Sequence, residues 1–153
     1  MLYWEGLRGE RRMKSIVETY DLTGKALPTI PVPHDCAIRE ISLADGWLVL
    51  SFEENIACHE SVQYSHPNAR TLRMRIHLLD EEFNLLAHER RRYENVYVER
   101  KPKKLFELAR REERLEYLSH LVGYGEMQIE LFQSAGSVLV DLCADRVEME
   151  WLE

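Results

Sequence analysis

Hydrophobic and polar residues alternate without a break between positions 71 and 78. Leu72, Met74, Ile76 and Leu78 are separated from one another by arginine and histidine residues. A period of two places the apolar set on one face of a β-strand and the polar set on the other. A buried apolar face opposite a wet cationic face is typical of an antiparallel sheet with one solvated side.

The same alternation recurs along most of the chain and predicts further strands. Their expected ranges are 15–22, 36–43, 47–53, 83–87, 94–99, 115–121, 127–131, 138–142 and 147–151. Asp45-Gly46 joins two of these strands, because glycine supplies the positive φ that a tight hairpin turn needs. Residues 55–70 have little pattern and are expected to form a loop.

One segment has helical periodicity instead. Pro102 is accepted in the first turn of a helix, and Leu105, Leu108 and Ala109 fit one helical face. We therefore expect a helix over about 103–113. Seven to nine strands and one helix predict a β-rich α+β fold, a mainly antiparallel twisted sheet or sandwich that the helix covers on one side or end.

The chain of 153 residues fits one globular domain, expected over 13–153. Residues 1–12 have no periodicity and are expected to be a disordered or leader segment. Gly9-Glu10 fits a purine-rich codon run ahead of the Met13 codon, where a ribosome-binding site would lie. We hypothesise that Met13 is the native start in a bacterium; a gene without such a run would contradict this.

Cysteine usage and hydropathy indicate a cytoplasmic protein. The three cysteines are scattered, which is typical of reduced intracellular thiols. No apolar run reaches the roughly 18 residues of a membrane span, and the charged start does not resemble a signal peptide. We expect no contact with a membrane and no cofactor.

Charge is distributed unevenly along the chain. The formal net charge of −7 argues against general nucleic-acid binding. Between positions 87 and 114, however, ten lysines and arginines accompany six acidic residues, whereas the remainder carries ten against twenty-one. Such asymmetry favours an oppositely charged protein partner or a second copy of the chain.

The strongest candidate for chemistry is His34-Asp35-Cys36, where a proline-rich connection enters a strand. With Cys58-His59 it predicts a small metal-dependent enzyme or sensor, with zinc bound by the two histidines and two cysteines. Neighbouring strand residues point to opposite faces, and the usual zinc-ligand spacing is missing. In the alternative interpretation Asp35 caps a turn and Cys36 fills a core position.

The basic segment suggests two kinds of partner. Arg90, Arg91 and Arg92 open a cationic run over 90–104, and Tyr97 lies within it, as in surfaces that bind RNA or single-stranded DNA. Interspersed glutamates and the lack of an RNA-binding motif favour a charged sheet edge instead.

For a protein partner, aromatic anchors would lie at the centre of the contact and the arginines at its rim. The predicted partner-binding residues are Trp47, Arg90, Arg91, Arg92 and Tyr97.

The segments His34–Ile38 (HDCAI) and Leu48–Glu53 (LVLSFE) resemble small β-rich bacterial immunity-type proteins and related families of unknown function. The stretches Tyr124–Ile129 and Leu142–Trp151 are similar to the way such chains finish. The long loop before Thr71 and the basic segment depart from the pattern. The resemblance implies a protein that binds and neutralises a partner toxin, with no catalytic residue to carry over. We therefore expect a non-catalytic protein-interaction module whose partner is another protein or a second copy.

Overall fold

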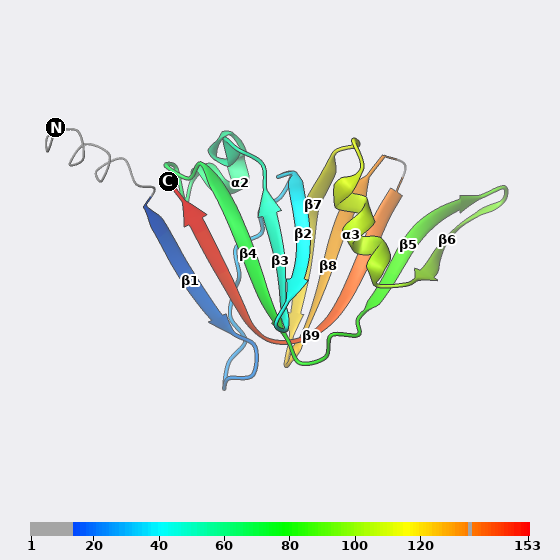
Figure 1. Cartoon of the computed structure of the whole chain (residues 1–153), viewed down its shortest axis with the longest axis horizontal. Helices are drawn as coiled ribbons and strands as arrows, with labels where there is room; N and C mark the ends of the chain where they lie inside the picture. Colours follow the sequence, from blue (N-terminus) through cyan, green and yellow to red (C-terminus); the bar gives the residue numbers. More distant parts are fainter. Residues whose placement is uncertain (1–13, 135) are drawn as a thin grey trace, which may run out of the picture.

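The computed structural model describes residues 14–134 and 136–153, so the predicted leader over 1–12 lies outside the described part. The fold is β-rich and antiparallel, as predicted (Figure 1). Its strands are β1 (Ser15–Asp21), β2 (Ile38–Ala44), β3 (Trp47–Phe52), β4 (Thr71–Leu78), β5 (Asn84–Arg91), β6 (Glu94–Arg100), β7 (Leu115–Gly123), β8 (Glu126–Gln133) and β9 (Gly136–Leu152). The helices are η1 (Ile56–Cys58), α2 (Glu60–Gln63) and α3 (Lys103–Arg110).

The long strand β9 belongs to two sheets. Its C-terminal half lies between β1 and β4 in a sheet of order β2-β3-β4-β9-β1, called sheet A. Its N-terminal half lies between β5 and β8 in a sheet of order β6-β5-β9-β8-β7, called sheet B. The two sheets fan apart from the bend in β9 (Figure 1).

The bend in β9 corrects one sequence-based expectation. Alternation predicts two strands, 138–142 and 147–151, because the buried positions change from even to odd numbers between them. In the structure both belong to one strand of 17 residues, whose buried positions shift between Ala144 and Val147. Its register with β4 is also irregular at this point. An extra residue of this kind bends a strand and increases its twist, so the strand passes from sheet B into sheet A.

A second connection joins the two sheets ahead of β2. Ala37 forms a bridge with Glu116 of β7, and the backbone N–H of Tyr117 donates to the carbonyl of Cys36 at 3.0 Å. This isolated bridge links the two sheets at a second point, although β2 and β7 themselves are not paired. The aromatic rings of Phe52 and Tyr117 meet nearby, with centroids 6.0 Å apart.

The interior is apolar, and helix α3 covers its open side against β2. Leu105 of α3 is buried, as are Phe52 and Trp151, and fully burying one large apolar side chain contributes about 1.5–3 kcal/mol. The indole N–H of Trp151 donates to Glu18, and the ring of His66 stacks on it at 3.8 Å. The polar edge of this tryptophan therefore finds a partner at the rim of sheet A.

Cations and carboxylates pair across the outer face of sheet A. Arg73 contacts Glu150 at 3.2 Å, and Arg75 contacts Glu148 at 3.4 Å. The strand predicted to carry a wet cationic face therefore lies beside the acidic C-terminal strand. These contacts match positive and negative side chains on neighbouring strands, a favourable arrangement in a sheet.

Residues 55–70 are more ordered than the predicted loop. Helices η1 and α2 form here because Ile56 and Val62 both turn into the core and are fully buried. Helix α3 ends at Arg110, short of the predicted end near 113. Strand β5 runs past the predicted residue 87 because β6 supplies pairing partners as far as Arg91.

A polar pair anchors the proline-rich connection to sheet B. An irregular step after Tyr117 in β7 turns His120 toward the interior, so that the two side chains meet. The imidazole Nε2–H of His120 donates to the carbonyl of Ile30 at 3.0 Å, and its Nδ1 accepts from the Tyr117 hydroxyl at 2.5 Å. With the tyrosine hydroxyl as the donor, the imidazole is neutral and carries its proton on Nε2, the form that burial of the ring favours.

We predict that this pair makes stability fall in acid. Burial lowers the pKa of His120 below its ordinary value of 6.5, so below that pH the unfolded chain takes up a proton that the folded chain resists. The free energy of unfolding should therefore decrease as the pH falls below about 6.5. Urea unfolding of the wild type and of His120→Gln at several pH values tests this. The variant should lose part of the pH dependence, and equal slopes would contradict the assignment.

Candidate functional site

A hairpin of strands β5 and β6 extends beyond the rest of sheet B (Figure 1). Strand β9 pairs only with the first residues of β5, as far as Ala87, and the outer part of the hairpin has no other strand beside it. Gly136 lies against this base, where a Cβ atom would approach His88 to 2.8 Å at Nδ1 and 3.3 Å at the backbone oxygen. Glycine is required here because it lets β9 lie close to β5.

A cleft of about 800 Å³ lies between helix α3, the base of this hairpin and the β8–β9 turn. We call it the cationic cleft. Four basic side chains converge on it from β5, β6, α3 and the residue after α3: Arg90, Arg100, Lys104 and Arg111. Its apolar lining consists of Leu85, Ala87, Leu108 and Val138. The cleft therefore combines positive charge with an apolar floor.

The cations of the cleft are incompletely neutralised. Arg100 lies 3.5 Å from Glu89, and Lys104 lies 3.1 Å from Glu107. Arg90 and Arg111 form no ion pair with any described residue. This contrasts with the outer face of sheet A, where the arginines of β4 are paired. Surplus positive charge in a concave site attracts anionic groups.

Gln133 supplies a second polar feature at the wall of the cleft. Its side chain is buried, and Nε2 donates to the carbonyls of Leu108 at 2.8 Å and Glu113 at 3.1 Å. These bonds fix the orientation of the carboxamide. The oxygen Oε1 is buried without a hydrogen-bond partner in the described part of the chain. A buried acceptor left unsatisfied costs about 1–3 kcal/mol, so this carboxamide is held in place at a cost in stability.

The residues predicted to bind a partner fall into two groups. Arg90 lines the cationic cleft, while Arg91, Arg92 and Tyr97 lie on the same hairpin. Trp47 lies apart from them on the outer face of sheet A. There its ring lies 4.9 Å from His77, and the Arg75 guanidinium lies 4.8 Å above it. The structure thus groups four of the predicted residues and separates the tryptophan.

The structure does not assemble the predicted zinc ligands into a metal centre. Among residues 14–134 and 136–153, no group of three or more histidine, cysteine or acidic side chains could hold a metal ion. His34 is exposed and contacts the carbonyl of Leu118 at 2.7 Å, while Nε2 of His59 lies 3.5 Å from Glu53. Cys36 is buried and Cys58 is exposed.

The region around Cys36 is held together by an ion-pair cluster. The guanidinium of Arg114 donates to Glu53 at 2.8 Å, to Glu116 at 2.9 Å and to the carbonyl of Asp35 at 2.8 Å. Glu53 also accepts from the backbone N–H of Ala37. These contacts fix the chain where the two sheets join, which is a structural role.

Burial, with the charge of Glu53 as a smaller cause, raises the pKa of the Cys36 thiol to about 12. Cys36 is therefore a neutral thiol at physiological pH, and a thiol is a poor nucleophile and metal ligand. This agrees with the alternative interpretation that it fills a core position.

Sequence reasoning missed two residues of the cleft, Arg111 and Gln133, whereas Arg100 and Lys104 lie in the basic segment 90–104. The spacing between Lys104 and Arg111 is seven residues, which places side chains on one face of a helix. The sequence spacing could therefore have indicated that Lys104 and Arg111 share a face, although Arg111 lies just after the end of α3. Nothing local marks Gln133, because its partners come from α3 and the segment that follows it.

Comparisons of the chain with protein-family models, curated proteins and solved structures found no match. The resemblance to immunity-type proteins therefore stays a prediction.

We predict that the three cysteines differ sharply in reactivity. Iodoacetamide at mildly alkaline pH should modify Cys58 and Cys143, which are exposed, and should leave Cys36 intact until the protein is unfolded in urea. Intact-mass spectrometry followed by peptide mapping measures this. Rapid modification of Cys36 in the folded protein would restore the view that it is a reactive thiol.

Proposed function

We propose that this protein is a non-catalytic binding module that captures an acidic segment of a partner protein in the cationic cleft. The observation that carries the proposal is the convergence of Arg90, Arg100, Lys104 and Arg111 on one cleft, two of them without an ion-pair partner in the described chain. Carboxylates of the partner would form charge-assisted hydrogen bonds with these groups, which are stronger than bonds between neutral groups.

The remaining lining fits an extended peptide. Side chains of Leu85, Leu108 and Val138 offer an apolar floor for alternate residues of the bound segment. Acidic side chains alternating with apolar ones therefore match the cleft in both charge and polarity.

Several features favour a protein partner over nucleic acid. The cleft has apolar walls, which suit the apolar side chains of a peptide better than a sugar–phosphate backbone. The whole chain has a net charge of −7. Binding to nucleic acid instead relies on neutralising many phosphates with lysines and arginines. A toxin whose acidic segment is covered in this way is one form that the partner would take, in keeping with the resemblance to immunity-type proteins.

The state of the thiols supports a binding role in a reducing compartment such as the cytoplasm. The thiol of Cys36, a candidate nucleophile or ligand, is held protonated in the core. All three cysteines are unpaired, as in a reducing compartment. None of the helices in the described ranges is long and apolar enough to cross a membrane.

The proposal predicts binding of a short fluorescein-labelled peptide of alternating glutamate and leucine, measured by fluorescence anisotropy. Lys104→Glu combined with Arg111→Glu should weaken binding by at least about tenfold, since charge-assisted bonds are replaced by repulsion. The matched control is Lys14→Glu with Lys25→Glu, two exposed positions away from the cleft that give the same net charge. This control should bind like the wild type.

Two outcomes would overturn the proposal. One is equal loss of binding in the cleft variant and the control, because the effect would then come from net charge alone. The other is tighter binding of a labelled oligouridylate of similar charge than of the peptide. That result would favour the alternative function, RNA or single-stranded DNA binding through residues 90–104.

A further inference from the structure

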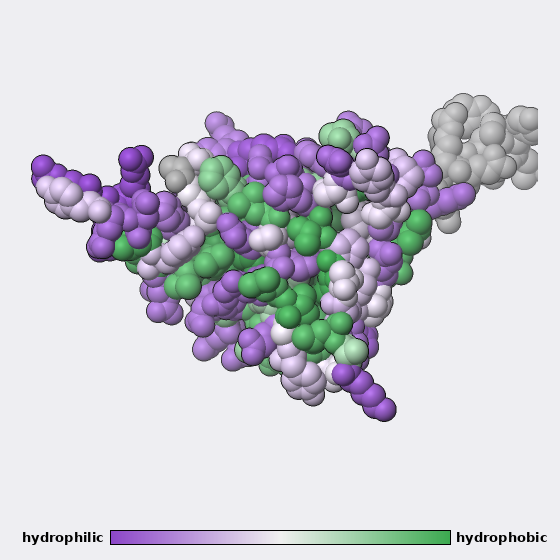
Figure 2. Space-filling view, turned by 180° about the vertical axis from the view of Figure 1, so that it is seen from behind, coloured by the Kyte–Doolittle hydropathy of each residue, from purple (hydrophilic) through white to green (hydrophobic). Residues whose placement is uncertain are grey.

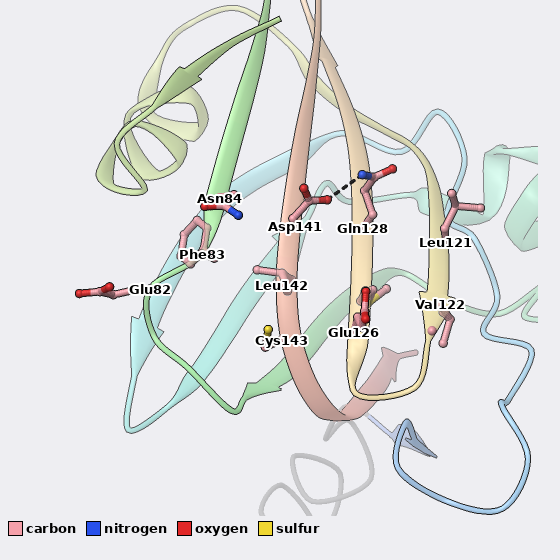
Figure 3. A pocket seen from close by; sticks show the side chains of 12 residues that line it. Glu82, Phe83, Asn84, Leu121, Val122, Glu126, Gln128, Asp141, Leu142 and Cys143 are labelled. Carbon is pink, nitrogen blue, oxygen red and sulfur yellow. Dashed lines mark hydrogen bonds between the residues drawn. The ribbon is translucent and has the colours of Figure 1, made fainter.

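Sheet B carries a second hollow, of about 640 Å³, on its outer face (Figure 3). It lies over β7, β8, β9 and the beginning of β5, and it shares no lining residue with the cationic cleft. Its lining includes Glu126, Gln128, Asp141 and Leu121. We call it the acidic hollow, because its lining contains three carboxylates and no lysine or arginine.

The carboxylates of the hollow are available for a cation. Asp141 accepts a hydrogen bond from Gln128 at 2.6 Å, which orients it, and it has no ion-pair partner in the described part of the chain. Glu126 is exposed at the rim and points out of the sheet (Figure 3). A cationic side chain entering here would find two acceptors on neighbouring strands.

Apolar side chains lie beside the hollow on the same face. Leu121 is 70% exposed, and Leu86 and Leu139 lie opposite each other on neighbouring strands. Figure 2, which views the molecule from behind, shows apolar patches broken by hydrophilic side chains on this side, with the hairpin extending beyond them. This mixture of an apolar centre and polar surroundings is typical of the surfaces that proteins use for contact.

The tip of the β5–β6 hairpin has the complementary chemistry. Arg91 and Glu94 are the last paired residues, so Arg92 and Tyr93 form the turn. Tyr93 is 87% exposed, and its ring has one described contact, the guanidinium of Arg92 at 5.4 Å from the centroid. Arg91 lies 3.6 Å from Glu89, and Glu94 follows the tyrosine. An exposed aromatic residue beside an arginine is the type of side chain that anchors a protein contact.

The hollow and the tip lie at opposite ends of β5, with Leu86 between them. When two copies place their sheet B outer faces together in antiparallel orientation, each tip comes over the hollow of the other. We propose that this face is a two-fold dimer interface, with Tyr93 and its arginines in the acidic hollow of the second copy and Leu86 and Leu139 near the axis. A two-fold contact requires one self-complementary surface, and this face carries both halves of the match.

Light scattering and sedimentation of the full chain at low salt test the proposal. The wild type should have the mass of a dimer. Arg91→Glu with Arg92→Glu should be monomeric, and so should Glu126→Arg with Asp141→Arg, because each variant repels itself at both ends of the interface. An equimolar mixture of the two variants should recover dimers, since each tip then meets a hollow of opposite charge.

Several controls separate this inference from misfolding and from the function of the cleft. Tyr93→Ala changes only an exposed residue and should weaken the dimer without lowering the melting temperature. The charge-matched Lys14→Glu/Lys25→Glu variant and the cleft variant Lys104→Glu/Arg111→Glu should both stay dimeric. A failure of peptide binding would therefore not contradict the proposed dimer. A monomeric wild type would likewise not contradict peptide binding in the cationic cleft.

A monomeric wild type at tens of micromolar protein would overturn the proposal. So would a dimer that survives both charge reversals, or a mixture of the two folded variants that stays monomeric.

Discussion

The fold depends on the pairing of one strand, β9, with four others. Its C-terminal half bonds β1 and β4, and its N-terminal half bonds β5 and β8. Each half is buried on its inner face by alternate residues, so a bend at Ala144 lets a single strand serve as the centre of two sheets. At the second junction, Arg114 fixes the chain before β2 against the start of β7. This junction would have no fixed geometry without the shared strand β9.

This arrangement of strands also determines which charged side chains are neutralised by ion pairs and which are not. In sheet A, the bend brings the acidic half of β9 beside β4, so that arginines and glutamates satisfy one another. The basic segment has no such neighbour, because β6 is an edge strand and the hairpin extends past the end of its contact with β9. Its cations therefore gather around a cleft on one side and a tip on the other. The two proposed contacts use these two separate groups.

Most of the secondary structure could be predicted from the sequence, since alternation directly reports a strand with one buried face. The exceptions have identifiable causes. The shift of buried positions in β9 suggests two strands, because periodicity cannot distinguish a bend from a break. Residues 55–70 hold short helices whose only signals are isolated apolar residues such as Ile56 and Val62. The composition of the sequence identified the basic segment, but it could not identify the cleft. Gln133 and Lys104 line the same cleft only because α3 packs beside the end of β8. Residue types likewise suggested metal ligands at Cys36 and Cys58, but the first thiol is buried and the second is exposed.

The position of β9 in the chain has a consequence for how the protein is made. Neither sheet has its central strand until residues 136–152 have left the ribosome, because all four neighbouring strands are synthesised earlier. The pairs that do not involve β9 can form earlier; they are β2–β3, β3–β4, β5–β6 and β7–β8. Pairs such as Ile16 with Trp151 join residues from opposite ends of the chain. Contacts this distant in sequence slow folding and leave strand edges exposed meanwhile. The growing chain therefore needs protection from aggregation until its last strand arrives.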